Sequence, residues 1–337
     1  MIESFPGITD RLAEPQGARV QLTIGLVNNM PDPALESTER QFRELLSIAG
    51  EAYDLRLRLF SFPEVMRDEA ARAYVAEHYD PIDDLWSGTC DGLVVTGAEP
   101  RTPSLPNETY WPPLARLVDW ASETATPTVW SCLAAHGAVL HLDGIERQPV
   151  GEKISGVFRC RIVADTTITA QLPSSWQVPH SRLNTLDPRR LTEAGYEILS
   201  ISEEAGVDMF QLRRHTLFLF LQGHPEYDGG ALFREYRRDV GRFLAGTRSQ
   251  YPEMPRSYFD ADTAHVLEHF RARAERRRTP EWLVEFPACD SSLTSRRPWG
   301  DVAVSLYKNW LAAVEGERTA TSLGNGGSAS IRAGRFT

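Results

Sequence analysis

The sequence predicts an α/β fold in which helices flank a mostly parallel sheet. Short apolar runs alternate with amphipathic stretches over the first half of the chain. Strands that alternate with helices are joined by right-handed crossovers and form parallel sheets. Several runs are apolar throughout, as expected for strands covered on both faces. Turn-forming residues end the first of these runs at Asn28-Asn29, and Gly97 ends another.

Each element of the first half follows from its hydrophobic period. Residues 20–27 alternate and then become continuously apolar, which indicates a first buried strand. Residues 55–60 alternate cleanly, residues 92–96 are again apolar, and a fourth strand leads into Cys132. Apolar side chains at helical spacing predict the intervening helices, at 34–49, 64–78 and 111–124.

After Gly144 the apolar runs become shorter and the sheet is expected to become antiparallel or mixed. An apolar run at 217–221 again has the character of a buried strand. A last apolar patch covers residues 302–314. The short predicted strands are 156–163, 166–172, 196–202 and 208–213, and the predicted helices are 231–244 and 261–277.

Composition excludes several classes of protein. The chain has 337 residues and a net charge of −10, which argues against a surface for nucleic acid. Its basic runs, at 271–278 and 296–297, are short and lie among acidic residues, as expected of a solvated helix face or loop. Its four cysteines have neither disulfide-framework nor metal-ligand spacing, so no metal site is expected and a reducing cytoplasm fits best. Neither a signal peptide nor a membrane span is expected.

The organisation predicted from these patterns is a single domain over residues 20–315. A polar, irregular arm is expected over residues 1–19. The glycine-, serine- and threonine-rich stretch at 316–337 is predicted to be a disordered tail.

Two strand ends carry the residues of a nucleophilic site. Cys132 follows one apolar strand and opens a helix, while His224 and Glu226 follow another. Parallel sheets collect ligands outside the carboxyl ends of their strands, so these residues are expected to meet. A thiol, an imidazole and a carboxylate are the parts of a nucleophile, its base and the group that orients the base. The pattern predicts acyl-transfer or hydrolytic chemistry.

The turn at Cys132 predicts a nucleophile elbow. The amino terminus of the following helix stabilises negative charge and so favours the thiolate. The backbone N–H of Leu133 would be one oxyanion donor, and the backbone near Ala98 or Glu99 could supply a second. His224 and Glu226 are two residues apart, so in extended backbone both side chains face the same way.

Seven ordered stretches of the sequence carry a family resemblance. They are Asn29-Met30-Pro31 with residues 39–46, then residues 91–98, Tyr110-Trp111-Pro112, residues 153–158, Pro179-His180-Ser181-Arg182, residues 223–228 and Asn309-Trp310-Leu311. Together they resemble the homoserine O-acyltransferase family of methionine biosynthesis, within the class I glutamine amidotransferase-like superfamily. The resemblance covers about 20–260 and again 295–315, and it implies a three-layer, flavodoxin-like fold with residues 264–290 as an insertion.

The resemblance also implies a ping-pong reaction in which Cys132 takes an acyl group from acyl-CoA and passes it to L-homoserine. It implies that His224 is the general acid and base, that Glu226 is its partner, and that Arg238 grips the substrate carboxylate. Lys153 and Ser181 match family residues near the substrate. No tightly bound cofactor is expected, and the family resemblance favours a cytoplasmic homodimer that acts on small molecules.

Arg101 occupies a loop position that tends to be glutamate in acetyl-transferring members of the family and glycine in succinyl-transferring ones. An arginine could pair with the free carboxylate of a succinyl group, which favours succinyl-CoA over acetyl-CoA as the donor. Serine remains open as the acceptor, because one methylene changes binding by only about 1–3 kcal/mol. A glutamine amidotransferase or glutaminase using the same triad, and a non-catalytic member of the fold, also remain alternatives.

Overall fold

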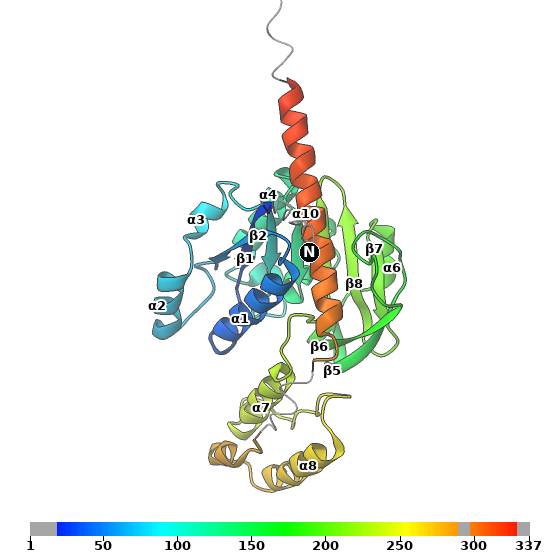
Figure 1. Ribbon diagram of the computed structural model, residues 1–337. Helices are drawn as coiled ribbons and strands as arrows, with labels where there is room; N and C mark the ends of the chain where they lie inside the picture. The colour runs from blue at the N-terminus through cyan, green and yellow to red at the C-terminus, as the bar shows by residue number, and fades with distance from the viewer. Residues whose placement is uncertain (1–18, 289–296, 329–337) are drawn as a thin grey trace, which may run out of the picture.

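The computed structural model of the chain describes residues 19–288 and 297–328, with only the backbone for 321–328. Its described residues form one sheet of nine strands in the order β2-β1-β3-β4-β9-β8-β7-β5-β6 (Figure 1). The strands are β1 (Gln21–Val27), β2 (Asp54–Phe60), β3 (Gly92–Val95), β4 (Thr128–Ser131), β5 (Gln148–Ile162), β6 (Ser175–Thr185), β7 (Glu197–Ser202), β8 (Gly206–Arg213) and β9 (Leu217–Leu221).

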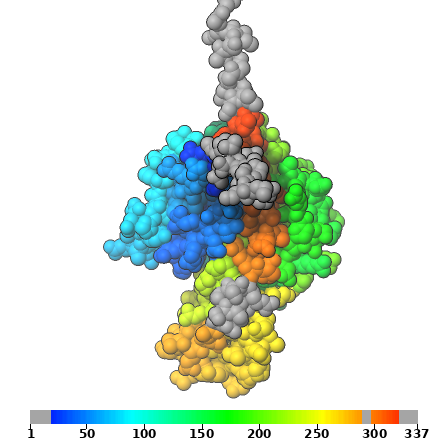
Figure 2. Space-filling model, in the orientation of Figure 1, coloured from blue at the N-terminus to red at the C-terminus, as the bar shows by residue number. Residues whose placement is uncertain are grey.

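Helices cover both faces of this sheet, as the alternating pattern predicted. They are α1 (Asp32–Ala49), α2 (Glu69–His78), α3 (Ile82–Leu85), α4 (Trp111–Glu123), α5 (Leu133–Asp143), α6 (Pro188–Glu193), α7 (Ala231–Leu244), α8 (Ala261–Arg276) and α10 (Gly300–Ser328). Two 3-10 helices are also described, η1 (Leu105–Asn107) and η2 (Pro280–Glu285). In Figure 2, α8 (yellow) and η2 (orange) form a lobe below the body that holds the sheet.

The sheet has a parallel half and an antiparallel half. Strands β2, β1, β3, β4 and β9 run parallel to their neighbours. From β9 onward the pairs β9–β8, β8–β7, β7–β5 and β5–β6 are antiparallel. The change of direction confirms the mixed sheet expected after Gly144. The parallel pairing of β3, β4 and β9 brings their carboxyl ends to one edge.

Alternate side chains of the parallel strands belong to two hydrophobic cores, one on each face of the sheet. In β9, Leu219 belongs to the core beneath α1 and α10, whereas Phe218 and Phe220 belong to the core beneath α4 and α5. Adjacent residues of a strand point to opposite faces, so a strand with both faces buried must be apolar throughout. This explains the continuous apolar runs and confirms the three-layer α/β class.

Three sequence predictions about elements need correction. The helix predicted from residue 64 begins at Glu69, because Asp68 caps it by accepting a 2.8 Å hydrogen bond from the Ala71 N–H. Residues 166–172 form turns rather than a strand. The strand β6 was missed, since Pro179 and the polar residues after it interrupt the alternation.

The predicted boundaries of the domain fall partly outside the described residues. Residues 1–18 of the predicted arm and 329–337 of the predicted tail lie there. Helix α10 continues to Ser328, so the chain is helical over 316–328, where disorder was predicted. The predicted insertion at 264–290 contains most of α8 and all of η2. Among the described helices, none combines the length and the apolarity needed to cross a membrane.

Candidate active site

The turn between β4 and α5 holds Cys132 in a strained backbone conformation. Its φ is 51° and its ψ is −110°, outside the regions that residues with a side chain usually occupy. The Cys132 N–H donates a 2.7 Å hydrogen bond to the Leu221 carbonyl at the end of β9, which ties the elbow to the neighbouring strand. Cys132 is only partly buried. This geometry is the predicted elbow, with the sulfur accessible from the cavity in front of it.

Gly97 allows the loop after β3 to lie against this elbow. A Cβ at Gly97 would come within 2.5 Å of the Leu133 Cβ and 3.1 Å of the Leu133 backbone nitrogen. Both Leu133 and Ala98 line the cavity that contains Cys132. The two backbone segments predicted to supply oxyanion donors are therefore neighbours beside the sulfur.

His224 is held by a carboxylate on one side and faces Cys132. Its Nδ1 lies 2.8 Å from Oε1 of Glu226, and both side chains are buried. Burial alone would lower the pKa of His224, but the Glu226 carboxylate and the Cys132 sulfur outweigh burial and hold that pKa well above its usual range. The site therefore favours an imidazolium beside the Cys132 sulfur. The ring of Tyr227 stacks on the imidazole at 4.2 Å and fixes its plane.

The loop that carries His224 rests on a buried polar cluster in the antiparallel half of the sheet. The His224 N–H donates to the Pro179 carbonyl of β6 over 2.8 Å. Beneath the loop, His180 Nε2 lies 3.2 Å from Oδ1 of Asp208. A Cβ at Gly223 would come within 2.6 Å of that same oxygen. Gly223 therefore allows the loop to lie directly on the cluster.

The cavity in front of Cys132 has a volume of about 230 Å³ and reaches from the elbow to α7. It is lined by eight of the nine predicted site residues, namely Cys132, His224, Glu226, Lys153, Ser181, Arg238, Leu133 and Ala98. Their convergence from six separate segments of the chain supports the predicted site.

A network of opposite charges forms the far wall of this cavity. Lys153 Nζ lies 2.8 Å from Asp239 and 3.4 Å from Glu235, and the Ser181 hydroxyl donates to Glu235. Arg238 donates from Nε and Nη2 to Asp239, each over 3.1 Å. Burial would raise the pKa of Asp239, but Lys153 and Arg238 lower it, so this carboxylate stays ionised. The wall therefore offers cationic groups and carboxylates to a zwitterionic ligand.

Glu235 and Asp239 were missed by the sequence analysis, although they are spaced four residues apart on an amphipathic helix. That spacing places both on one face of α7. A second signal was available, because Arg238 lies between them in sequence. Acidic residues beside a predicted substrate-binding arginine can be recognised as candidates from sequence alone.

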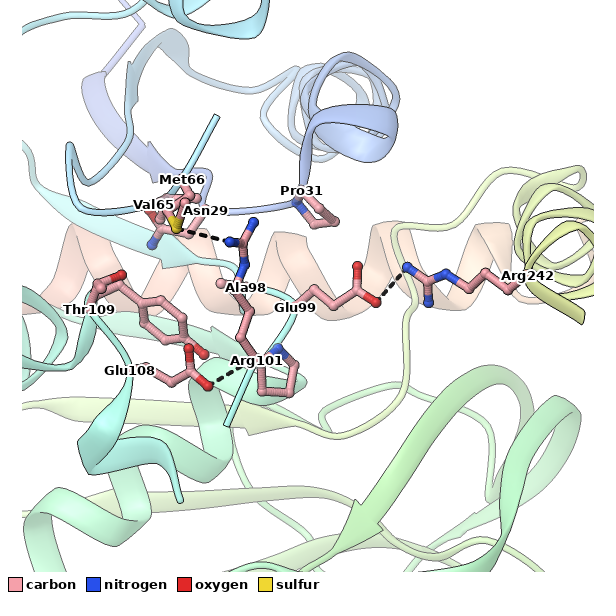
Figure 3. Close-up of a pocket in the computed structure, with 12 residues that line it drawn as sticks. Asn29, Pro31, Val65, Met66, Ala98, Glu99, Arg101, Glu108, Thr109 and Arg242 are labelled. Atoms are coloured by element: carbon pink, nitrogen blue, oxygen red, sulfur yellow. Dashed lines mark hydrogen bonds and ion pairs between the residues drawn. The ribbon is translucent and has the colours of Figure 1, made fainter. Parts of the chain in front are cut away.

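Arg101 is the predicted site residue that does not line this cavity. It lines a neighbouring pocket and is exposed, with its Nη1 2.9 Å from the Met66 sulfur (Figure 3). An ion pair between Glu99 and Arg242, 2.6 Å long, stands on the walls of both pockets. The structure thus brings Arg101 near the loop of the site but not to the sulfur.

His136 lies on α5, one turn after the nucleophile. Its Nε2 is 2.8 Å from Oε1 of Gln222, and the ring is almost fully buried. Burial lowers the pKa of His136 to about 4, so the ring is neutral at physiological pH. Gln222 in turn donates to the Val207 carbonyl over 2.8 Å. His136 thereby links α5 to the end of β9.

Comparison with known proteins identifies close relatives over nearly the whole chain. A family model described as homoserine O-succinyltransferase matches residues 3–320. The homoserine O-succinyltransferase of Rhodopseudomonas palustris is 47% identical over 300 residues, which is 89% of this chain and 90% of that protein. The enzyme of the same name from Bradyrhizobium japonicum is 48% identical over 293 residues, covering 87% of this chain and 90% of the relative.

Solved structures with a similar arrangement are more distant in sequence. A glutamine amidotransferase from Methylobacillus flagellatus matches with a TM-score of 0.49 and 14% identity, covering 88% of this chain and 96% of that one. One from Thermotoga maritima matches with a TM-score of 0.46 and 15% identity, covering 88% and 98%.

Proposed function

The chain belongs to the homoserine O-succinyltransferase family and is an O-acyltransferase, and on this premise we propose that it carries the succinyl group as a thioester on Cys132. The observation that carries this mechanism is the strained elbow of Cys132 facing His224, with Glu226 bound to the other ring nitrogen. We assign the reaction to methionine biosynthesis.

In the first half-reaction the Cys132 thiolate attacks the thioester carbonyl of succinyl-CoA. Negative charge develops on the carbonyl oxygen, where the backbone N–H groups at Leu133 and Ala98 would stabilise it. The bond to the CoA sulfur then breaks, and the leaving thiolate takes the proton of the His224 imidazolium. Free CoA departs, leaving succinyl-Cys132 and a neutral imidazole.

In the second half-reaction the homoserine hydroxyl attacks this new thioester. The neutral His224 removes the hydroxyl proton as the C–O bond forms, and Cys132 leaves as a thiolate. The products are the O-acyl amino acid and the original imidazolium–thiolate pair. Glu226 stabilises the imidazolium in both half-reactions, so the same contact serves both proton transfers.

The charged wall of the cavity matches the acceptor. Homoserine is a zwitterion, so its site must supply a cation for the carboxylate and anions for the ammonium group. Arg238 presents a planar guanidinium suited to a carboxylate, while Glu235 and Asp239 offer acceptors for an ammonium. Lys153 and Ser181 hold these acids in place.

This chemistry draws only on side chains, backbone donors and the two substrates. We therefore propose succinyl-CoA as a co-substrate rather than a resident cofactor. The reaction further suggests a cytoplasmic enzyme, since CoA esters and amino acids are both available there. By family resemblance we also propose a homodimer, which light scattering of the purified protein would test.

One experiment distinguishes the two acyl donors, the two acceptors and the rival activity, which is glutamine hydrolysis. The protein is mixed with succinyl-CoA or acetyl-CoA, and free CoA and the mass of the Cys132 peptide are measured before and after homoserine or serine is added. We expect a succinyl adduct that homoserine discharges. Absence of any adduct, or glutamine hydrolysis without acyl transfer, would overturn the proposal.

A further inference from the structure

The cations around the Cys132 cavity differ in whether a partner already neutralises them. Four of them pair with carboxylates: Lys153 and Arg238 with Asp239, Arg242 with Glu99, and Arg248 with Asp239. Arg182 donates to the carbonyls of Asn184 and Ala205. The cations that line the cavity are Arg147, Lys153, Arg182, Arg238, Arg242 and Arg248. Arg147 alone remains without a described acceptor for one of its buried guanidinium nitrogens.

Arg147 lies just before β5, and a hydrogen bond holds only one of the two terminal nitrogens of its guanidinium. Its Nη2 donates a 3.1 Å hydrogen bond to the Pro103 carbonyl, while its Nη1 is buried and finds no hydrogen-bond partner among residues 19–288 and 297–328. No carboxylate among the residues described here lies within ion-pair distance of it. A buried donor without an acceptor is costly, so an anionic ligand at this position would stabilise the guanidinium.

The groups around Arg147 do not supply that anion. Glu108 influences Arg147 electrostatically, but its Oε1 already accepts hydrogen bonds from the backbone of Arg101 and from Thr102. The remaining influence comes from Tyr110 and from the sulfur of Cys132. Burial lowers the pKa of Arg147, and these groups only partly oppose it. The guanidinium therefore lines the same cavity as the Cys132 sulfur, and no carboxylate in the described part of the chain forms an ion pair with it.

We propose that Arg147 binds the free carboxylate of the succinyl group and thereby selects succinyl-CoA over CoA esters of neutral acyl groups. The assignment rests on the proposed acyl-Cys132 mechanism. A succinyl group on the sulfur ends in a carboxylate, and a guanidinium that lines the same cavity can bind it through two parallel hydrogen bonds. The carboxylate would satisfy Nη1.

Arg147, rather than the Arg101 predicted from sequence, is then the residue that selects the acyl donor. The Arg101 side chain is exposed in the neighbouring pocket, whereas Arg147 lines the cavity of the nucleophile. The two arginines thus make opposite predictions for the same measurement.

The test compares R147M with R101M in the acylation half-reaction, using succinyl-CoA, acetyl-CoA and butyryl-CoA. Butyryl has nearly the shape of succinyl without its charge. Because a charged hydrogen bond contributes about 1.5–3 kcal/mol, we expect R147M to lower kcat/KM for succinyl-CoA by about 10–100-fold. Acylation by acetyl-CoA and butyryl-CoA should change less than about threefold, and R101M should leave the donor preference unaltered.

Other outcomes distinguish a failure of the Arg147 assignment from a failure of the acyl-Cys132 mechanism. Equal losses with all three donors, or a donor-selective loss in R101M instead, would overturn the role of Arg147 and leave the mechanism standing. A wild-type protein that forms no succinyl adduct would overturn both. If R147M does not fold, R147K is measured instead. It should lose succinyl-CoA selectivity in part, and an unchanged preference would contradict the assignment.

Discussion

The two halves of the sheet contribute different things to the site. The parallel half supplies backbone turns at strand ends, where Cys132 and His224 are held close together. The antiparallel half and α7 supply charged side chains, among them Lys153 and Asp239, which satisfy one another before any ligand binds. Bond making thus depends on a strained backbone, and recognition depends on a balanced set of charges. Substitutions in the two halves should therefore impair different steps of the reaction.

The strongest test of the parallel half is C132A. The sulfur is the atom that carries the acyl group, so its removal should abolish the adduct and lower turnover by about 10⁴-fold or more. Intact-mass spectrometry after mixing with succinyl-CoA, and the release of free CoA, measure the two effects. C90A, which removes a buried thiol outside the cavity, is the matched control. Acyl transfer that survives in C132A would rule out the covalent mechanism.

A smaller loss is expected for E226Q, which keeps the shape of the side chain but removes its charge. Glu226 opposes the effect of burial on His224, so the pKa of His224 should fall in the variant. Acylation needs the imidazolium, and its alkaline limit should therefore move to lower pH. We expect kcat to fall by about 10²–10⁴-fold, measured across a pH series. A pH profile with an unmoved alkaline limb would show that Glu226 has only a structural role.

The antiparallel half and α7 are tested by R238A, which should affect acceptor binding and spare the donor. Loss of the guanidinium should lower kcat/KM for homoserine by about 10–100-fold and change single-turnover acylation by less than about threefold. The exposed neighbour Arg237 provides the control R237A, with both parameters expected to match wild type. An acylation defect as large as the acceptor defect would contradict the division between the halves.

The same division decides how much could be predicted from sequence. Buried parallel strands are apolar throughout and end in recognisable turns, so the position of Cys132 and its meeting with His224 followed from periodicity and sheet topology. Strand β6 has no such pattern, because Pro179 and the buried polar residues after it satisfy long-range contacts that periodicity does not encode. The unpaired nitrogen of Arg147 likewise depends on what surrounds it in space.

The mildest effect is expected at Gly223, where the two halves meet. In G223A the new Cβ would lie 2.5 Å from Val178 and 2.6 Å from Asp208, so the His224 loop must move away from the cluster beneath it. Overpacking of this kind costs about 1–3 kcal/mol, which thermal unfolding would measure as a lower Tm. The exposed Gly151 has open space around its Cβ direction, and G151A is the control. Because the loop carries the base, acylation and transfer to the acceptor should slow together in G223A. A variant that slowed only the transfer to homoserine would show that Gly223 does not position His224.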